Sequence, residues 1–227
     1  MTITTHSKTQ DAQIQRDVLA ELRWDSRIGE TEVGVEVDDG VVTLTGYVGS
    51  YAKRIAAEDA AHRVPAVRDV ANDVLVHVPG GFSHTDTDIA HAVRRALEAD
   101  VFLPAEDIRT TVTDGWVTLE GEVSFWRERE DATRAIRHLA GVRGVTNEIL
   151  VRRTFVDPEN VRTTIEEALE RRAEREAERI GVRVDEGVVT LTGKVHSWRE
   201  KRAVLGSVGH APGVISVVDR LDVKPYA

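Results

Sequence analysis

The residues best suited to binding chemistry recur at one position of a repeated pattern. In each repeat an aromatic residue is followed three positions later by a basic one, namely Tyr51 and Arg54, Trp126 and Arg129, and Trp198 and Lys201. An aromatic ring with a polar edge suits a lipid interface or the surface of a partner protein, and a nearby cation can bind a phosphate. In the alternative, each ring packs over the start of its own helix or the sheet edge, and the cations are solvated. Acidic neighbours such as Glu128 and Glu130 dilute the positive charge and favour this alternative.

Other residue types show no spacing that would support catalysis or metal binding. The eight histidines lack the His-x-x-x-His and facial-triad spacings and do not repeat between copies. Acidic pairs such as Asp38-Asp39 supply too few oxygens for calcium, which takes about six or more ligands. Walker, G-x-G-x-x-G and G-x-S-x-G motifs are absent, and the chain has no cysteine. The sequence therefore predicts a non-enzymatic protein without catalytic residues, a metal or a cofactor.

Charge and hydropathy narrow the classes of partner. The net charge of −9 argues against nucleic-acid binding, which needs a concentrated basic face. The first ten residues lack the apolar core of a secretory signal, and no stretch approaches the length of a membrane span. We therefore expect a cytoplasmic protein, or a periplasmic one if a signal segment has been removed. The sequence does not predict an oligomeric state.

The chain is organised around one stretch that occurs three times. The copies read DGVVTLTG from Asp39, DGWVTLEG from Asp114 and EGVVTLTG from Glu186. The first glycine of each copy supplies the positive φ of a tight hairpin turn, at Gly40, Gly115 and Gly187. The second glycine lies on the buried face of the returning strand, where a side chain would meet a helix packed across the sheet, at Gly46, Gly121 and Gly193. Equivalent residues are 75 apart from Gly40 to Gly115 and 72 apart from Gly115 to Gly187.

The elements around each copy follow from hydrophobic periodicity. A first helix precedes it, with apolar residues at i, i+4 and i+8, such as Ile14, Val18 and Leu22. A strand of period two enters the turn, a second strand leaves it, and a second helix and a last strand follow. Each unit thus reads α-β-β-α-β. The expected fold class is α+β, with three tandem units that each form a three-stranded mixed sheet covered on one face by two helices.

The repeats also divide the chain. Residues 1–10 are polar and aperiodic, which predicts a disordered tail. The units are expected at 11–78, 84–152 and 157–224. Units of about 70 residues are near the lower limit for a self-sufficient core, so we expect them to gain stability by packing on one another.

These motifs resemble a known family. The run V-x-V-x-x-G-x-V-x-L-x-G-x-V, a helix that contains tryptophan, and then G-V-x-x-V-x-N-x-L-x-V resemble the BON domain (bacterial OsmY and nodulation). All three units match, which covers nearly everything after residue 10. Three positions depart from the pattern: Ala66 replaces a glycine, Asp219 replaces the asparagine, and Tyr51 replaces the tryptophan.

The resemblance implies an αββαβ fold and a binding role. BON domains are proposed to bind phospholipids and to help maintain the cell envelope under osmotic shock, and the family has no catalytic residues. It therefore implies a phospholipid or an envelope component as the ligand, in a response to osmotic stress. The alternative is a cytoplasmic protein–protein interaction module without lipid affinity, which the negative charge and the missing signal segment favour.

Overall fold

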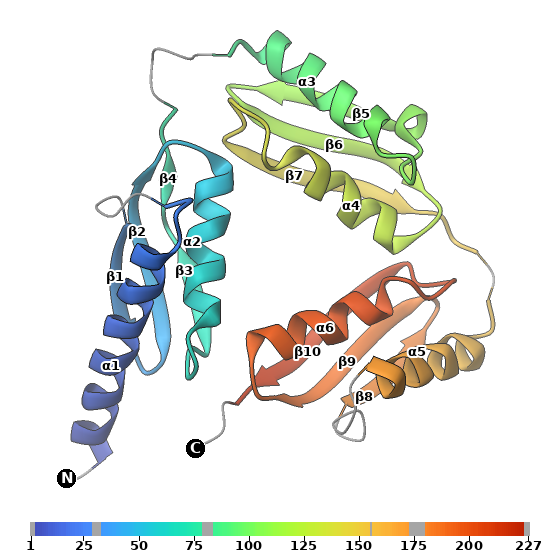
Figure 1. The fold of residues 1–227 in the computed structure, drawn as a ribbon. Coiled ribbons are helices and arrows are strands. Elements are labelled where there is room, and N and C mark those ends of the chain that lie inside the picture. Colours follow the sequence, from blue (N-terminus) through green and yellow to red (C-terminus); the bar gives the residue numbers. More distant parts are fainter. Residues whose placement is uncertain (1–2, 29–32, 79–83, 155, 173–179, 225–227) are drawn as a thin grey trace.

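The structure is a computed structural model that describes residues 3–28, 33–78, 84–154, 156–172 and 180–224. Its elements form three consecutive αββαβ units (Figure 1). Unit 1 comprises α1 (Ile3–Trp24), β1 (Val33–Asp38), β2 (Val41–Val48), α2 (Tyr51–Arg63), β3 (Asp69–Asn72) and β4 (Leu75–Val76). Unit 2 comprises α3 (Asp86–Ala99), a 3-10 turn (Ala105–Asp107), β5 (Ile108–Thr113), β6 (Trp116–Val123), α4 (Trp126–Ile136) and β7 (Gly144–Val151). Unit 3 comprises α5 (Pro158–Arg172), β8 (Ile180–Asp185), β9 (Val188–Val195), α6 (Trp198–Val208) and β10 (Ser216–Val223).

Each sheet is mixed, as the sequence predicts. The first two strands pair antiparallel, and the last strand pairs parallel to the middle one. In unit 1 the last strand is divided into β3 and β4, which both pair with β2. Figure 1 shows the two helices of each unit on the same side of its sheet. The expected α+β class with three αββαβ units is thus confirmed.

Every unit has its own hydrophobic core. The predicted stripe of the first helix is buried in all three, at Ile14, Val18 and Leu22, at Ile89, Val93 and Leu97, and at Val161, Ile165 and Leu169. These side chains pack against the middle strand and the second helix of the same unit. Because the apolar face repeats every three to four residues, burial of this stripe fixes the rotation of each first helix on its sheet.

The hairpin turns are tight and carry two residues with positive φ. Asp39 has φ 48° and Gly40 has φ 79°, and the other two turns repeat this pair of values closely. Two consecutive residues with positive φ are typical of two-residue hairpin turns, whose twist matches that of the two strands they join. In unit 2 the backbone N–H groups of Asp114 and Gly115 donate to the Asp86 carboxylate, at 2.9 and 2.8 Å. Asp11 makes the same two bonds in unit 1, so in both units the first helix is bonded to the turn.

We expect Asp86→Ala to lower the free energy of unfolding by about 1–3 kcal/mol, because it removes two charge-assisted hydrogen bonds to backbone amides. Urea denaturation followed by circular dichroism measures the change. The matched control is Glu98→Ala on the same helix, whose carboxylate is 58% exposed and lies 4.0 Å from Arg94. This control should cost less than about 0.5 kcal/mol. Equal losses in the two variants would contradict the assigned role of Asp86.

The structure differs from the sequence-based prediction at the N-terminus. Helix α1 begins at Ile3, so residues 3–10 are helical and the prediction of a disordered tail is wrong for them. Residues 3–10 contain neither proline nor glycine, so nothing interrupts the helix that the apolar stripe starts further along the chain. Residues 1–2 lie outside the described residues.

Gly121 is required for a reason other than the one predicted for the closing glycines. Gly46, Gly121 and Gly193 all have positive φ, from 119° to 136°. A Cβ added at Gly121 would lie 2.0 Å from the carbonyl oxygen of Asp107, just before β5, and would not meet a helix. Gly121 pairs with Ile108 at the start of that strand, where the backbone enters the sheet. The close approach is therefore between the backbone of β6 and that of the residue just before β5.

Candidate functional site

The three aromatic residues that the sequence singles out each begin a second helix. Tyr51, Trp126 and Trp198 are the first residues of α2, α4 and α6, and all three are half-buried. The preceding Ser50 and Ser197 cap two of these helices, since their hydroxyls accept from backbone N–H groups in the first turn. In α2 and α6 these caps fix where the helix starts, and therefore where its aromatic residue stands.

Tyr51 forms the junction between units 1 and 2. Its ring packs against the core of unit 2. Its backbone N–H donates to the carbonyl oxygen of Val142 at 3.4 Å. Burial raises the pKa of the Tyr51 hydroxyl above its usual value. The side chain therefore behaves as part of an interface between units.

Trp126 forms the junction between units 2 and 3. Its ring packs against the cores of both units. It lies over Gly209, where an added Cβ would be 3.1 Å from the ring carbon Cδ1. Beside it, the guanidinium of Arg127 contacts Nε2 of His210. Trp126 thus contacts the end of the second helix of the next unit.

Trp198 forms the junction between units 3 and 1. Its ring stacks on the His62 imidazole, with centroids 3.9 Å apart and planes at 23°. Its Nε1–H donates to the carbonyl oxygen of Val67 at 3.0 Å. An ion pair from Arg202 to Asp59, at 2.7 Å, joins the same two helices. Burial is the main cause that lowers the pKa of His62, so a neutral imidazole is favoured beneath the indole.

The three junctions use equivalent positions. Val67 and Val142 occupy the same place in units 1 and 2, and each carbonyl accepts from the aromatic residue of another unit. His62 and Gly209 are also equivalent, and each lies against a tryptophan ring. Because the start of the second helix contacts the next unit in the order 1 to 2, 2 to 3 and 3 to 1, the chain closes into a ring with approximate threefold symmetry. Figure 1 shows the second helices α2, α4 and α6 on the inner side of this ring.

The basic residues expected near the aromatics are bonded within their own units. Arg54 donates to the carbonyl of Asn72 at 2.8 Å, and Lys201 donates to that of Leu221 at 3.1 Å. Arg129 donates to two carbonyls of β7, at 3.0 and 2.9 Å. These side chains tie the second helix to the last strand. Binding of a phosphate by them stays a prediction, and it would require these bonds to be exchanged.

The three departures from the family pattern each have a local structural explanation. Ala66 keeps the positive φ of the glycine it replaces, at 70°. Asp219 forms an ion pair with Lys201 at 2.9 Å, whereas Asn147 donates to the Arg129 carbonyl at 2.7 Å. Tyr51 occupies the same kind of junction as the two tryptophans.

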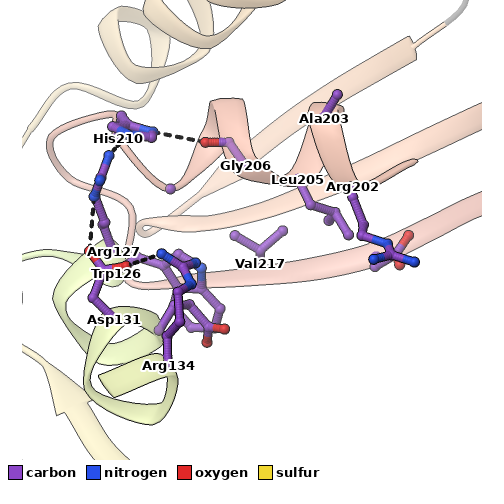
Figure 2. A pocket seen from close by; sticks show the side chains of 13 residues that line it. Trp126, Arg127, Asp131, Arg134, Arg202, Ala203, Leu205, Gly206, His210 and Val217 are labelled. Atoms are coloured by element: carbon purple, nitrogen blue, oxygen red, sulfur yellow. Dashed lines mark hydrogen bonds and ion pairs between the residues drawn. The ribbon is translucent and has the colours of Figure 1, made fainter. Parts of the chain in front are cut away.

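A pocket of about 790 Å³ lies between α4 and α6, at the junction of units 2 and 3 (Figure 2). Thirteen residues line it, among them Trp126, Leu205, Gly206 and Val217. No pattern in the sequence predicted this pocket. The sequence does contain a sign of it. When the second helices are aligned, Gly206 and Gly209 stand where unit 1 has Asp59 and His62.

The charged side chains that line this pocket are not paired one to one. One carboxylate, that of the buried Asp131, accepts from both Arg127, at 2.9 Å, and Arg134. The other two carboxylates that line the pocket have cationic partners, Glu130 with Arg129 and Asp219 with Lys201. The pocket therefore combines an apolar side with three arginines and three carboxylates, and its positive charge is concentrated at Arg127 and Arg134, which share one carboxylate.

In the parts of the chain that the structure describes, histidine and carboxylate side chains form no group of three or more that could hold a metal ion. No helix in the same residues has the length and apolarity needed to cross a membrane.

Comparisons with known proteins agree with the repeat pattern. The family model of the BON domain matches residues 10–77, 85–153 and 157–225. The osmotically-inducible protein Y of Escherichia coli (strain K12) is 29% identical over 144 residues, which cover 61% of this chain and 71% of that protein. Among solved structures, CdsD, a structural protein of the type III secretion system of Chlamydia trachomatis, aligns at 13% identity with a TM-score of 0.28, over 93% of this chain and 92% of that one. A structure of the CdsD C-terminal domain aligns at 13% identity with a TM-score of 0.26, over 92% of this chain and 96% of that one.

Proposed function

This chain belongs to the BON domain family, and from that premise we propose that it is a non-enzymatic protein that binds a phospholipid surface as part of a response to osmotic stress. Its relationship to an osmotically-inducible protein supports the link to stress. The observation that carries the lipid proposal is a pair of exposed apolar turns, one at the end of the first helix of unit 1 and one at the end of that of unit 2. The helix-two aromatics are engaged at the junctions, so the proposed lipid contact lies elsewhere on the ring.

The exposed apolar turns follow the first helices of units 1 and 2. They present Trp24, which is 83% exposed, and Val101 and Phe102, which are 87% and 77% exposed. Few soluble surfaces leave side chains of this size so fully in water, and insertion into the acyl boundary of a membrane would bury them. The polar edge of Trp24 suits the headgroup level.

Both turns are held in the same way. The backbone N–H of Ile28 donates to the carbonyl of Asp25 at 3.0 Å. In the equivalent turn of unit 2, the backbone N–H of Leu103 donates to the carbonyl of Asp100 at 3.1 Å. Ile28 and Leu103 are buried beneath the turns. Asp25 also accepts from Arg27 and Arg63, which hold the pKa of its carboxyl far below the usual range. The turns are therefore pre-organised to present apolar side chains outward.

The ring adds a geometric argument. A threefold ring places equivalent turns at the same level along its axis, so the turns of units 1 and 2 can approach one plane together. The corresponding turn of unit 3 lies outside the described residues. Two attachment points on one rigid body bind a surface more tightly than either alone.

Co-sedimentation with vesicles tests the proposal. We expect the protein to sediment with neutral phosphatidylcholine vesicles, and less with anionic ones at low salt, because the net charge of −9 is repelled. Changing Trp24, Val101 and Phe102 together to alanine should weaken binding about tenfold or more, since each buried side chain contributes about 1.5–3 kcal/mol. The control is Leu150→Ala, which removes a side chain that is 70% exposed on β7 and should leave binding unchanged.

A second candidate function is supported by a separate observation. Tyr47, Leu75 and Trp116 are 63%, 57% and 46% exposed and line one hollow of about 670 Å³ shared by units 1 and 2. Tyrosine and tryptophan are the residue types that dominate protein–protein interfaces. The vesicle experiment separates the two candidates. Wild-type protein that sediments with neither vesicle, or a folded triple variant that binds as wild type does, would overturn the lipid proposal and leave the protein partner.

A further inference from the structure

Two equivalent tryptophans have different surroundings. Trp198 lies between Lys201, whose Nζ is 5.0 Å from the ring centroid, and the stacked imidazole of His62. Trp126 has the corresponding cation, since Cζ of Arg129 is 4.8 Å from its ring centroid. At the position of His62, however, unit 3 has Gly209. The ring of Trp126 therefore lacks the planar partner that completes the sandwich around Trp198.

A second missing side chain enlarges the same region. Gly206 stands where unit 1 has Asp59, and a Cβ built at Gly206 meets no atom within 4 Å. The pocket of about 790 Å³ lies at these two glycines, with Trp126, Leu205 and Val217 as its apolar side (Figure 2). Its volume is typical of sites for small molecules. The pocket thus opens where a carboxylate stands at the junction of units 3 and 1, whereas at the position of His62 the Trp126 ring lies close to the backbone, 3.1 Å from a Cβ built at Gly209.

The charges of the pocket specify the kind of ligand that it would bind. Arg127 and Arg134 share the single carboxylate of Asp131, which leaves about one positive charge uncompensated. The third arginine of the pocket, Arg202, is paired with Asp59 of unit 1. Arg127 also contacts Nε2 of His210, whose Nδ1–H donates to the Gly206 carbonyl. An anionic group of a ligand could replace the His210 imidazole as the acceptor beside the Arg127 guanidinium.

We propose that the pocket between α4 and α6 binds a small planar aromatic monoanion. Its ring stacks on the part of the Trp126 ring that lines the pocket beside Gly206, and its acid group accepts hydrogen bonds from Arg127 and Arg134. Stacking and a charge-assisted bidentate contact together select a flat ring that carries one acid group. This site is independent of the exposed apolar turns, so the vesicle experiment and the experiment below can fail separately.

Isothermal titration calorimetry with 2-naphthoate, a planar aromatic monoanion, tests the site on the full chain. We expect saturable binding at one site per chain. The neutral isostere 2-naphthamide should bind about tenfold more weakly, because it lacks the charge that the arginines recognise. Cyclohexanecarboxylate, which has the charge but no flat ring, should also bind about tenfold more weakly.

Two variants locate the binding in the pocket. Gly206→Phe fills the open space with little strain on the helix and should abolish binding of 2-naphthoate. Arg134→Gln should weaken it about tenfold. The control, Leu150→Ala, lies on an exposed strand face outside the pocket and should bind as wild type does. The absence of saturable binding in wild type, equal affinity for the amide, or full binding in folded Gly206→Phe would each overturn the proposal.

Discussion

Replacing Trp198 by alanine is expected to open the ring between units 3 and 1 while the other two junctions stay closed. The change removes the stack on His62 and the hydrogen bond to the Val67 carbonyl. Together with the lost burial, these should destabilise the junction by about 2–4 kcal/mol. The ion pair from Arg202 to Asp59 remains, but both side chains are partly exposed, so it contributes about 1 kcal/mol or less.

Small-angle X-ray scattering measures this opening as a larger radius of gyration. The matched control is Trp24→Ala, which removes a tryptophan that is 83% exposed and so buries little surface against any other unit. It should leave the scattering curve unchanged. If Trp198→Ala scatters as wild type does, the junction of units 3 and 1 does not depend on this side chain, and a different contact must close the ring.

Gly121→Ala is expected to unfold unit 2. The new Cβ would lie 2.0 Å from the Asp107 carbonyl oxygen, and the residue would keep a φ of 136° that side chains rarely adopt. A backbone atom cannot move aside as a flexible side chain can, so the cost should exceed about 4 kcal/mol. That is comparable to the whole stability of a unit of this size.

Urea denaturation followed by circular dichroism should show a loss of native signal in dilute urea for Gly121→Ala. The control, Gly206→Ala, places the same methyl group in open space inside a helix. It should be neutral or stabilise by up to about 1 kcal/mol, because alanine favours helices more than glycine does. A Gly121→Ala variant that unfolds at the same urea concentration as wild type would show that β5 and β6 can separate at this point.

Most of the fold within a unit could be predicted from the sequence because its determinants are local. The alternation around Val42 and Leu44, the acidic residue and glycine of each turn, and the helical stripe from Ile14 each act over a few residues. Three copies of the pattern reinforce one another, which is why the family resemblance was specific.

The arrangement of the units could not be predicted in the same way. The contact of Trp198 with His62 joins residues 136 positions apart, from 62 to 198, and no periodicity reports such a pairing. A recurrent aromatic residue at a helix start is compatible with a lipid anchor, a partner surface or a junction. The pocket depends on two glycines that differ between copies, and the residues that the copies share do not reveal them.

Distances between paired spin labels test most directly whether the three units form a closed ring. The chain has no cysteine, so cysteines can be introduced in pairs for labelling at Glu36, Thr111 and Arg183, which are equivalent and exposed in the three units. A threefold ring predicts the same narrow distance for all three pairs. A distance between residues 36 and 183 that is longer and broader than the other two would contradict closure and describe an open chain of units.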